Sequence, residues 1–264
     1  MNNPNSLQYL MDRQEPSNLF LEARQIAGVQ LQEQFSLVNQ LAQQAPQDAF
    51  RWIKAELTYP AFEHLTFAFK KSLFAVIIEV RNGNESSLTD QQVNRLQAAC
   101  LANNLIACVF VIEIDDALAP ANLGWNLIDP QTREFINPVA VAEDGPVEMS
   151  AWEMSNFSIQ VVRDYLEKQG NEVMSFCDLP EVNPQVWFQN SDGQVCWLIV
   201  QNTTTDTPLL ASDWITFEES NPALKPYSGY YAAVRIKSMQ QVLFRGAGMM
   251  VDFKGIEKIY DGED

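Results

Sequence analysis

Residues 65–83 read LTFAFKKSLFAVIIEVRNG, and this stretch decides the fold of the chain. Its first part alternates apolar residues with smaller or polar ones, the period-two pattern of a strand with one buried face. Residues 73–78, LFAVII, are continuously apolar, which is typical of a central strand covered on both faces. The pattern predicts two strands joined by a turn at 70–72, the second of which ends where the sequence NGN begins at Asn82.

The residues that follow extend this sheet. Thr89 is placed to cap the start of a helix whose apolar face runs from Val93 to Ala102. Residues 106–112 form another apolar run, which indicates a second buried strand. The order strand–strand–helix–strand predicts an α/β unit.

Further elements are expected on both sides of this unit. Upstream, apolar residues at helical spacing predict one helix over 18–44 and a second over 47–57, which Pro60 ends. Downstream, a hairpin of 124–127 and 135–141 is expected around Asp129-Pro130. The second half predicts a helix over 156–169, a strand over 173–177, a hairpin of 186–189 and 195–201, a helical stretch over 213–220, and closing strands over 230–237 and 242–253.

These elements divide the chain into two modules. We expect a flexible N-terminus over 1–16, a first module over 17–141, a linker over 142–150 (AEDGPVEMS), and a second module over 151–264. The predicted fold class is α/β (α+β), with a mixed β-sheet flanked by helices in each module. Because both modules place a helix before paired strands, a diverged internal duplication is one interpretation.

The charge of the chain narrows the class of partner. There are 34 acidic and 17 basic residues, which gives a net charge of −17. The negative electrostatic field of such a chain repels nucleic-acid phosphates and anionic lipid headgroups. The basic residues are scattered and not gathered in a basic stretch. We therefore expect neither a nucleic-acid nor a membrane partner, and expect another protein with a basic surface.

The cysteines and the hydropathy indicate a compartment. No two cysteines form a C-x-x-C pair, and each lies in or beside an apolar run, where a free thiol packs as a small hydrophobic group. Residues 1–13 lack the pattern of a signal peptide, and the longest apolar runs are too short to span a bilayer. A cytoplasmic location is expected.

The common catalytic and cofactor motifs are missing from the sequence. Its one histidine, His64, has no accompanying G-x-S-x-G motif, and neither a phosphate-binding loop nor a dinucleotide-binding glycine fingerprint occurs. Gly246 and Gly248 lie in an apolar stretch, where glycines mark a bulge or tight packing more often than a phosphate site. The sequence therefore predicts no cofactor.

One short motif does suggest chemistry. Glu79-Val80-Arg81 ends the buried strand, and the predicted helix follows with Gln91 and Gln92 near its start. Across residues 62–114, this arrangement resembles the core of the restriction-endonuclease-like superfamily, the PD-(D/E)xK nucleases. In that family a buried strand ends in an acidic residue, any residue and a lysine.

The resemblance implies a Mg²⁺-dependent nuclease in which Glu79 and Glu63 hold the metal ion and Arg81 takes the place of the lysine. The sequence departs from the family at two points. No Pro-Asp precedes the strand, and an arginine stays protonated and cannot act as a base. The alternative is structural, because Glu79 and Arg81 lie on one face of a strand and can pair with each other or with solvent.

Two functions from different classes follow. The first, which the charge and the incomplete motif favour, is a non-catalytic acidic interaction or accessory module of a bacterial-type cytoplasmic protein. The alternative is a divergent Mg²⁺-dependent nuclease. A mimic of DNA would need acidic residues in regular rows, and the sequence shows no such period.

Overall fold

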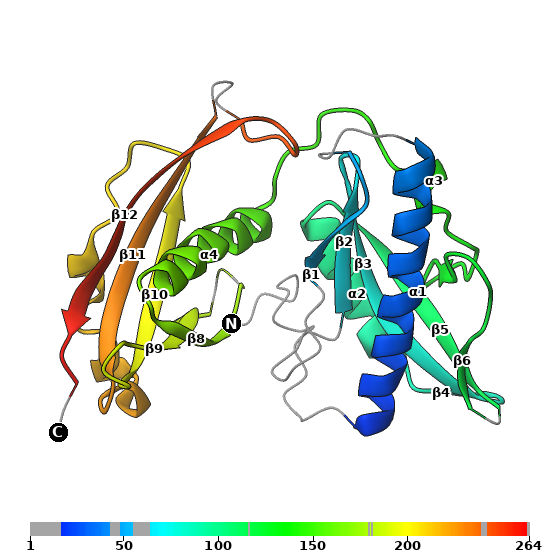
Figure 1. The fold of residues 1–264 in the computed structure, drawn as a ribbon, viewed down its shortest axis with the longest axis horizontal. Coiled ribbons are helices and arrows are strands. Elements are labelled where there is room, and N and C mark those ends of the chain that lie inside the picture. The colour runs from blue at the N-terminus through cyan, green and yellow to red at the C-terminus, as the bar shows by residue number, and fades with distance from the viewer. Residues whose placement is uncertain are drawn as a thin grey trace. The chain divides into compact units, whose positions relative to one another are not determined.

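The computed structural model describes residues 17–42, 48–54, 64–115, 117–178, 180, 182–238 and 242–262. The chain divides into two compact units, Met1–Val147 (unit 1) and Glu148–Asp264 (unit 2). Each unit is a mixed β-sheet packed with helices (Figure 1), so the predicted α/β class is confirmed. Within the described residues, no helix is long and apolar enough to cross a membrane.

The sheet of unit 1 is built around the two predicted strands. β2 (His64–Phe69) and β3 (Ser72–Asn82) form an antiparallel hairpin, and β3 then runs parallel to β5 (Leu105–Ile114) through helix α2 (Asp90–Ala102). The outer strands are all antiparallel to their neighbours: β1 (Arg51–Lys54) pairs with β2, β4 (Glu85–Ser86) with β3, and both β6 (Leu118–Pro120) and β7 (Leu127–Ile128) with β5.

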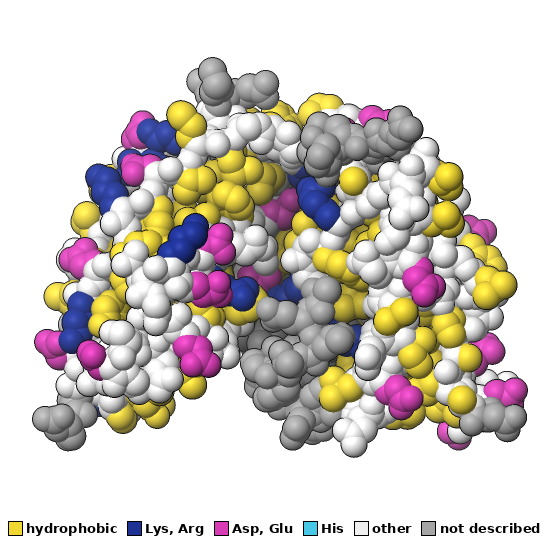
Figure 2. All heavy atoms as spheres, in the orientation of Figure 1, with side chains coloured by type: hydrophobic (Ala, Val, Ile, Leu, Met, Phe, Trp, Pro, Cys, Tyr) yellow, Lys and Arg dark blue, Asp and Glu magenta, His cyan; other side chains and the backbone are white. Residues whose placement is uncertain are grey.

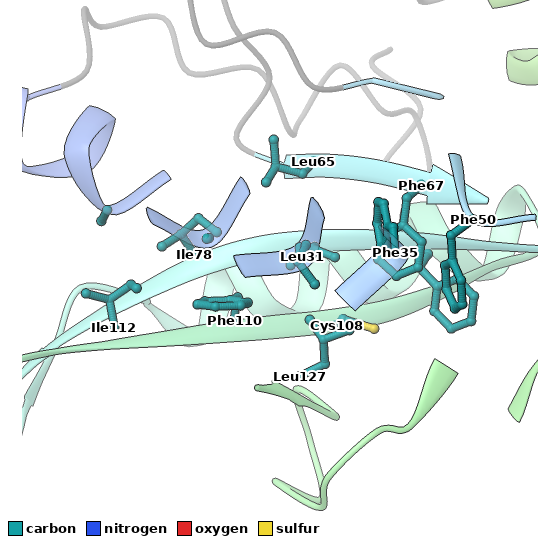
Figure 3. Packing of buried hydrophobic residues seen from close by; sticks show 14 of the residues in the cluster. Leu31, Phe35, Phe50, Leu65, Phe67, Ile78, Cys108, Phe110, Ile112 and Leu127 are labelled. Atoms are coloured by element: carbon teal, nitrogen blue, oxygen red, sulfur yellow. The ribbon is translucent and has the colours of Figure 1, made fainter. Parts of the chain in front are cut away.

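Helix α1 (Asn18–Ala42) covers one face of this sheet. Its inward side chains pack on alternate residues of β2, β3 and β5. Figure 3 shows Phe35 beside Phe50 and Phe67, with ring centroids 5.1 Å and 4.9 Å from that of Phe35. Because aromatic rings bury a large apolar area, this cluster fixes α1 on the sheet.

Helix α2 covers part of the opposite face. The Thr89 hydroxyl accepts the Gln92 N–H at 3.3 Å, and Gln92 Oε1 accepts the Thr89 N–H at 2.9 Å. This capping box satisfies backbone donors that the first helical turn leaves unpaired. Leu96, Ala99 and Cys100 are buried, as are the β3 residues on the same face, including Glu79.

Unit 2 follows the same order of elements. Helix α4 (Ala151–Lys168) packs on a sheet of five strands within the described residues. The strands β8 (Glu172–Phe176), β9 (Val186–Gln189) and β10 (Val195–Thr203) are antiparallel, β11 (Ser228–Ser238) runs parallel to β10, and β12 (Met249–Tyr260) is antiparallel to β11.

The main strands of the two units follow the same order of antiparallel and parallel pairings. Each unit has three antiparallel strands, then a parallel strand, then an antiparallel edge strand. The parallel registers agree as well, because Leu73 lies beside Leu105 and Cys196 lies beside Ser228, each pair being 32 residues apart. The two units therefore share one order of strand pairing.

The units differ in the crossover between their parallel strands. In place of a helix like α2, unit 2 has three 3₁₀ helices, η2 (Ala211–Trp214), η3 (Phe217–Ser220) and η4 (Pro222–Leu224). They cover the sheet face opposite α4, where Trp197 is fully buried and donates its indole N–H to Tyr227 O at 3.0 Å. The helical stretch expected over 213–220 is present as two short 3₁₀ helices, η2 and η3, separated at 215–216.

Two predicted elements of unit 1 are wrong. Residues 51–54 were expected in a helix but form β1, where Trp52 pairs with Phe67 of β2; the rest of that predicted helix lies partly outside the described residues. Residues 138–141 were expected as a strand but form the short helix α3, because Asn137 caps it and Pro138 suits its first position.

Two boundaries in unit 2 also move. Helix α4 begins at Ala151 rather than at 156, because Ser150 and Glu153 form a capping box in front of it. Strand β12 begins at Met249 rather than at 242. Residues 242–248, which were expected in this strand, include Arg245. Its guanidinium makes two 2.8 Å hydrogen bonds to the Glu153 carboxylate.

Candidate functional site

The predicted site residues Glu79 and Arg81 lie near the carboxyl end of β3, on the sheet face opposite α1. Glu63, the second carboxylate of the nuclease hypothesis, lies outside the described residues. His64 is the first residue of β2. The structure therefore gives a full environment only for the Glu79–Arg81 part of the motif.

Glu79 is buried, with 4% of its surface exposed. Its Oε1 accepts a hydrogen bond from the Ser86 hydroxyl at 2.7 Å, and its Oε2 accepts from Arg81 Nη2 at 3.1 Å and from Arg133 Nη2. The pairing with Arg81 is the one that the structural alternative predicted. We call these four residues, Glu79, Arg81, Ser86 and Arg133, the Glu79 cluster.

Sequence reasoning missed Arg133, which a tight loop brings to the cluster. Asp129 Oδ1 accepts the N–H groups of Gln131 and Thr132, each at 2.8 Å, and Asp129 O accepts the Arg133 N–H at 3.0 Å. Arg133 itself is left-handed, with φ at 61°. The Asp129-Pro130 turn was predicted, but a turn signal says nothing about which side chain crosses to a strand 54 residues away.

The cluster keeps Glu79 ionised. Burial raises the pKa of a carboxyl group, but the hydrogen bonds from Arg81, Arg133 and Ser86 outweigh burial and leave the pKa of Glu79 lowered. About a third of each arginine side chain is exposed, so the outer side of the cluster meets solvent. The cluster therefore joins β3 to the loop at 129–134 by an ion pair and to β4 by the hydrogen bond from Ser86.

The donors around Glu79 do not fit a Mg²⁺ ion. Magnesium takes oxygen ligands, whereas both oxygens of this carboxylate already accept hydrogen bonds, two of them from cations. Across the described residues, no group of three or more His, Cys, Asp or Glu side chains lies together as a metal site. Because Glu63 is not described, the nuclease resemblance stays a prediction.

The buried thiols are poor nucleophiles. Burial raises the pKa of Cys100 to about 12, and burial also raises the pKa of Cys108 well above its ordinary value. Both thiols therefore stay protonated at neutral pH. Because the thiolate is the reactive form of cysteine, neither is a good nucleophile. They serve the core of unit 1.

A second candidate site lies on the outer side of α1. One concavity of about 470 Å³ separates α1 from the segment that includes Pro120 and Leu123, and another of about 400 Å³ separates α1 from Trp52 and Leu65. Gln25, Val29 and Glu33 line both. We call the outward residues from Gln25 to Gln34, together with these flanking side chains, the α1 surface.

The α1 surface combines exposed apolar groups with anchored walls. Val29 is 55% exposed and Leu123 is 99% exposed. Gln30 Nε2 donates to Gly124 O at 2.6 Å on one side, and Trp52 donates its indole N–H to Gln32 Oε1 at 2.8 Å on the other. The walls are therefore tied to the helix by hydrogen bonds.

The α1 surface is acidic where it is charged at all. Of the described residues that line the two concavities, Glu33 alone carries a charge. In Figure 2 the area over α1 shows yellow hydrophobic and magenta acidic side chains among uncoloured polar ones. This surface can offer apolar contacts beside one negative side chain, that of Glu33.

Comparison with known proteins finds a family model that matches part of unit 2. Residues 152–259 match a family model described as Domain of unknown function (DUF8840), from the start of α4 almost to the end of β12. No curated protein and no solved structure matches the chain. The comparison therefore brings no activity or partner to either candidate site.

Proposed function

We propose that this protein is a non-catalytic, acidic interaction module whose α1 surface docks a basic amphipathic segment of another protein. The observation that carries the proposal is the α1 surface. Apolar side chains are exposed there in two concavities, and the outer walls of these concavities are hydrogen-bonded to α1. Exposed apolar groups that lie together and have a polar rim are typical of protein-binding sites.

The apolar part would supply most of the binding free energy. Fully burying a valine or leucine side chain contributes about 1.5–3 kcal/mol. Val29 and Leu123 on opposite walls of one concavity, with Leu37 52% exposed further along α1, are available as anchors. A few such anchors at the centre of an interface usually carry its affinity.

The charge would select the partner. Unit 1 carries 17 acidic and nine basic residues, so a basic segment is attracted from a distance before apolar contact begins. Glu33 lies between the two concavities and can meet a lysine or arginine at the rim of the docked segment. Salt should weaken this contact, because exposed charges are screened within about 10 Å at 0.1 M.

The Glu79 cluster supports a non-catalytic role. The Glu79 carboxylate accepts hydrogen bonds from three donors, two of them arginines. A carboxylate with these partners is not positioned to bind a metal ion or to activate water. The cluster ties the loop at 129–134 to β3, which is a structural task.

Calorimetric titration with a synthetic amphipathic helix of Leu and Lys tests the proposal. We expect saturable binding, with Val29→Asp weakening it about tenfold or more, because a charge in place of the anchor removes apolar contact. Leu101→Asp is the matched control, since Leu101 is 85% exposed on α2 and the charge change is the same.

Three results would overturn the proposal. A peptide of Leu and Glu could bind as tightly as the basic one, or Leu101→Asp could weaken binding as much as Val29→Asp. Light scattering of the protein alone could also show self-association that Val29→Asp abolishes, in which case the α1 surface would hold a second copy of the chain.

A further inference from the structure

A cavity of about 270 Å³ lies in unit 2, on the sheet face opposite α4. It is unrelated to the α1 surface and rests on different observations. Three side chains of β11, four residues of β12 and one of the crossover line it: Tyr231, Ala233, Arg235, Asp252, Lys254, Gly255, Glu257 and Leu209.

The cavity lies at the edge pair of strands in unit 2. Its lining runs over the middle of β11 and along β12, the antiparallel edge strand beside it. Arg235, the last of the β11 residues in the lining, pairs with Thr203 at the end of β10.

The lining brings both signs of charge into a small space. Arg235 and Lys254 are cationic, and Asp252 and Glu257 are anionic. In a chain with twice as many acidic as basic residues, this balance differs from the average surface. A zwitterion is the small molecule whose charges match such a lining.

The charged groups are only loosely paired with one another. Arg235 Nη2 lies 3.4 Å from Thr207 O, Arg235 Nη1 lies 3.8 Å from Asp252 Oδ2, and the Nε–H has no acceptor among the described residues. Within that same part of the chain, Lys254 and Glu257 form no ion pair. These side chains can therefore bind a ligand without first breaking strong contacts.

We propose that this cavity binds a small zwitterion of the α-amino-acid class with an apolar side chain. Arg235 and Lys254 receive the carboxylate, for which the planar guanidinium is suited. Asp252 and Glu257 receive the ammonium group. The apolar side chain of the ligand contacts Leu209, Tyr231 and Ala233.

Tyr231 is a buried residue in the lining of this site. Burial, together with the nearby carboxylates of Asp213 and Glu257, raises the pKa of Tyr231 to about 12. The hydroxyl therefore keeps its proton at neutral pH. A molecule of the size of leucine is small enough for a cavity of about 270 Å³.

Three related probes test the proposal by ¹H–¹⁵N NMR titration of the full chain: L-leucine, N-acetyl-L-leucine without the ammonium group, and L-leucinamide without the carboxylate. We expect L-leucine to shift the β11 and β12 amides saturably, with each analogue binding about tenfold or more weakly. Lys254→Gln should weaken L-leucine binding several-fold, because Lys254 lies exposed on an edge strand and its loss leaves the fold intact.

Lys168→Gln is the matched control, since it makes the same charge change in the last turn of α4, on the other face of the sheet. Arg235→Gln is a second test, and an unchanged β11 spectrum without ligand shows that this variant still folds. The proposal is wrong if L-leucine gives no saturable shifts up to about 10 mM. It is also wrong if N-acetyl-L-leucine binds as tightly, which would indicate a plain anion site.

Discussion

Glu79 shows how one residue can resemble a catalytic group and serve a structural purpose. A carboxylate with 4% exposure is costly unless donors satisfy it, and Ser86, Arg81 and Arg133 do so. Because the two arginines remain partly exposed, the cluster avoids the full desolvation of a buried ion pair.

Glu79→Gln should lower the free energy of unfolding by about 1–3 kcal/mol, since the amide cannot accept all three hydrogen bonds and leaves two guanidinium groups without their anion. Urea denaturation measures this loss. Glu85→Gln, an exposed change on the neighbouring β4, should leave stability within about 0.5 kcal/mol. Equal effects of the two variants would contradict the role of the cluster.

The same residue gives a pH dependence with a definite sign. The pKa of Glu79 is lower in the folded than in the unfolded chain, so its contribution is present above the unfolded value and is lost as the pH falls through the folded value. The stability difference between the wild type and Glu79→Gln should therefore shrink below about pH 4. A difference that grows in acid would show that the sign is wrong.

Gly229 is a residue whose lack of a side chain the packing requires. A Cβ there would lie 2.2 Å from the Trp197 ring, which is fully buried beside the crossover. Gly229→Ala should thus destabilise the protein by about 1–3 kcal/mol through overpacking. Gly248→Ala is the control, because open space surrounds that position, and thermal unfolding of the two variants separates them.

At the scale of elements, long patterns with caps were predictable and short ones were not. The strands β3 and β5 and the helix between them were predicted because each had a long apolar pattern, and Thr89 marked the helix start. The four residues of β1 were too few to fix a period, and their pairing with β2 decided their conformation.

The start of α4 depends on a contact that the sequence pattern did not reveal. Glu153 completes the capping box and also accepts two hydrogen bonds from Arg245, in a turn 92 residues away. Arg245→Gln leaves this buried carboxylate without its cation, so a loss of about 3–5 kcal/mol is expected.

Ser150→Ala removes only the cap and should cost about 1 kcal/mol. Urea denaturation of both variants tests this ranking. If Ser150→Ala costs as much as Arg245→Gln, the ion pair contributes little beyond the cap.

At the scale of the whole molecule, two units share one pairing order but differ where the parallel strands end. In unit 1 the end of β3 carries the Glu79 cluster, whereas in unit 2 β10 ends in the uncharged residues Gln201, Asn202 and Thr203. The sequence suggested a repeat only loosely, because strand direction and register depend on long-range pairing that a hydrophobic pattern does not encode.

The candidate sites were predictable to a smaller extent than the fold. Glu79 and Arg81 were found because they are adjacent on one strand, whereas Arg133 reaches them from a separate loop. The α1 surface and the cavity of unit 2 are formed by side chains far apart in the sequence, such as Val29 with Leu123 and Leu209 with Asp252. Neither pair has a local sequence signal.

The net charge of −17 is shared almost equally, with 17 acidic residues in each unit against nine basic residues in unit 1 and eight in unit 2. Attraction of a basic segment by charge alone would therefore act on both units. Selective binding must come from the apolar contacts of the α1 surface, and this separates the proposal from general electrostatic attraction.

The most direct test follows the indole N–H of Trp52 by ¹H–¹⁵N NMR while the Leu and Lys peptide is added to the full chain. Trp52 lines one α1 concavity and donates to Gln32, so docking there should shift its signal together with the α1 amides. Salt should weaken the effect, and Val29→Asp should remove it. Shifts spread over both units with Trp52 unmoved would contradict the account.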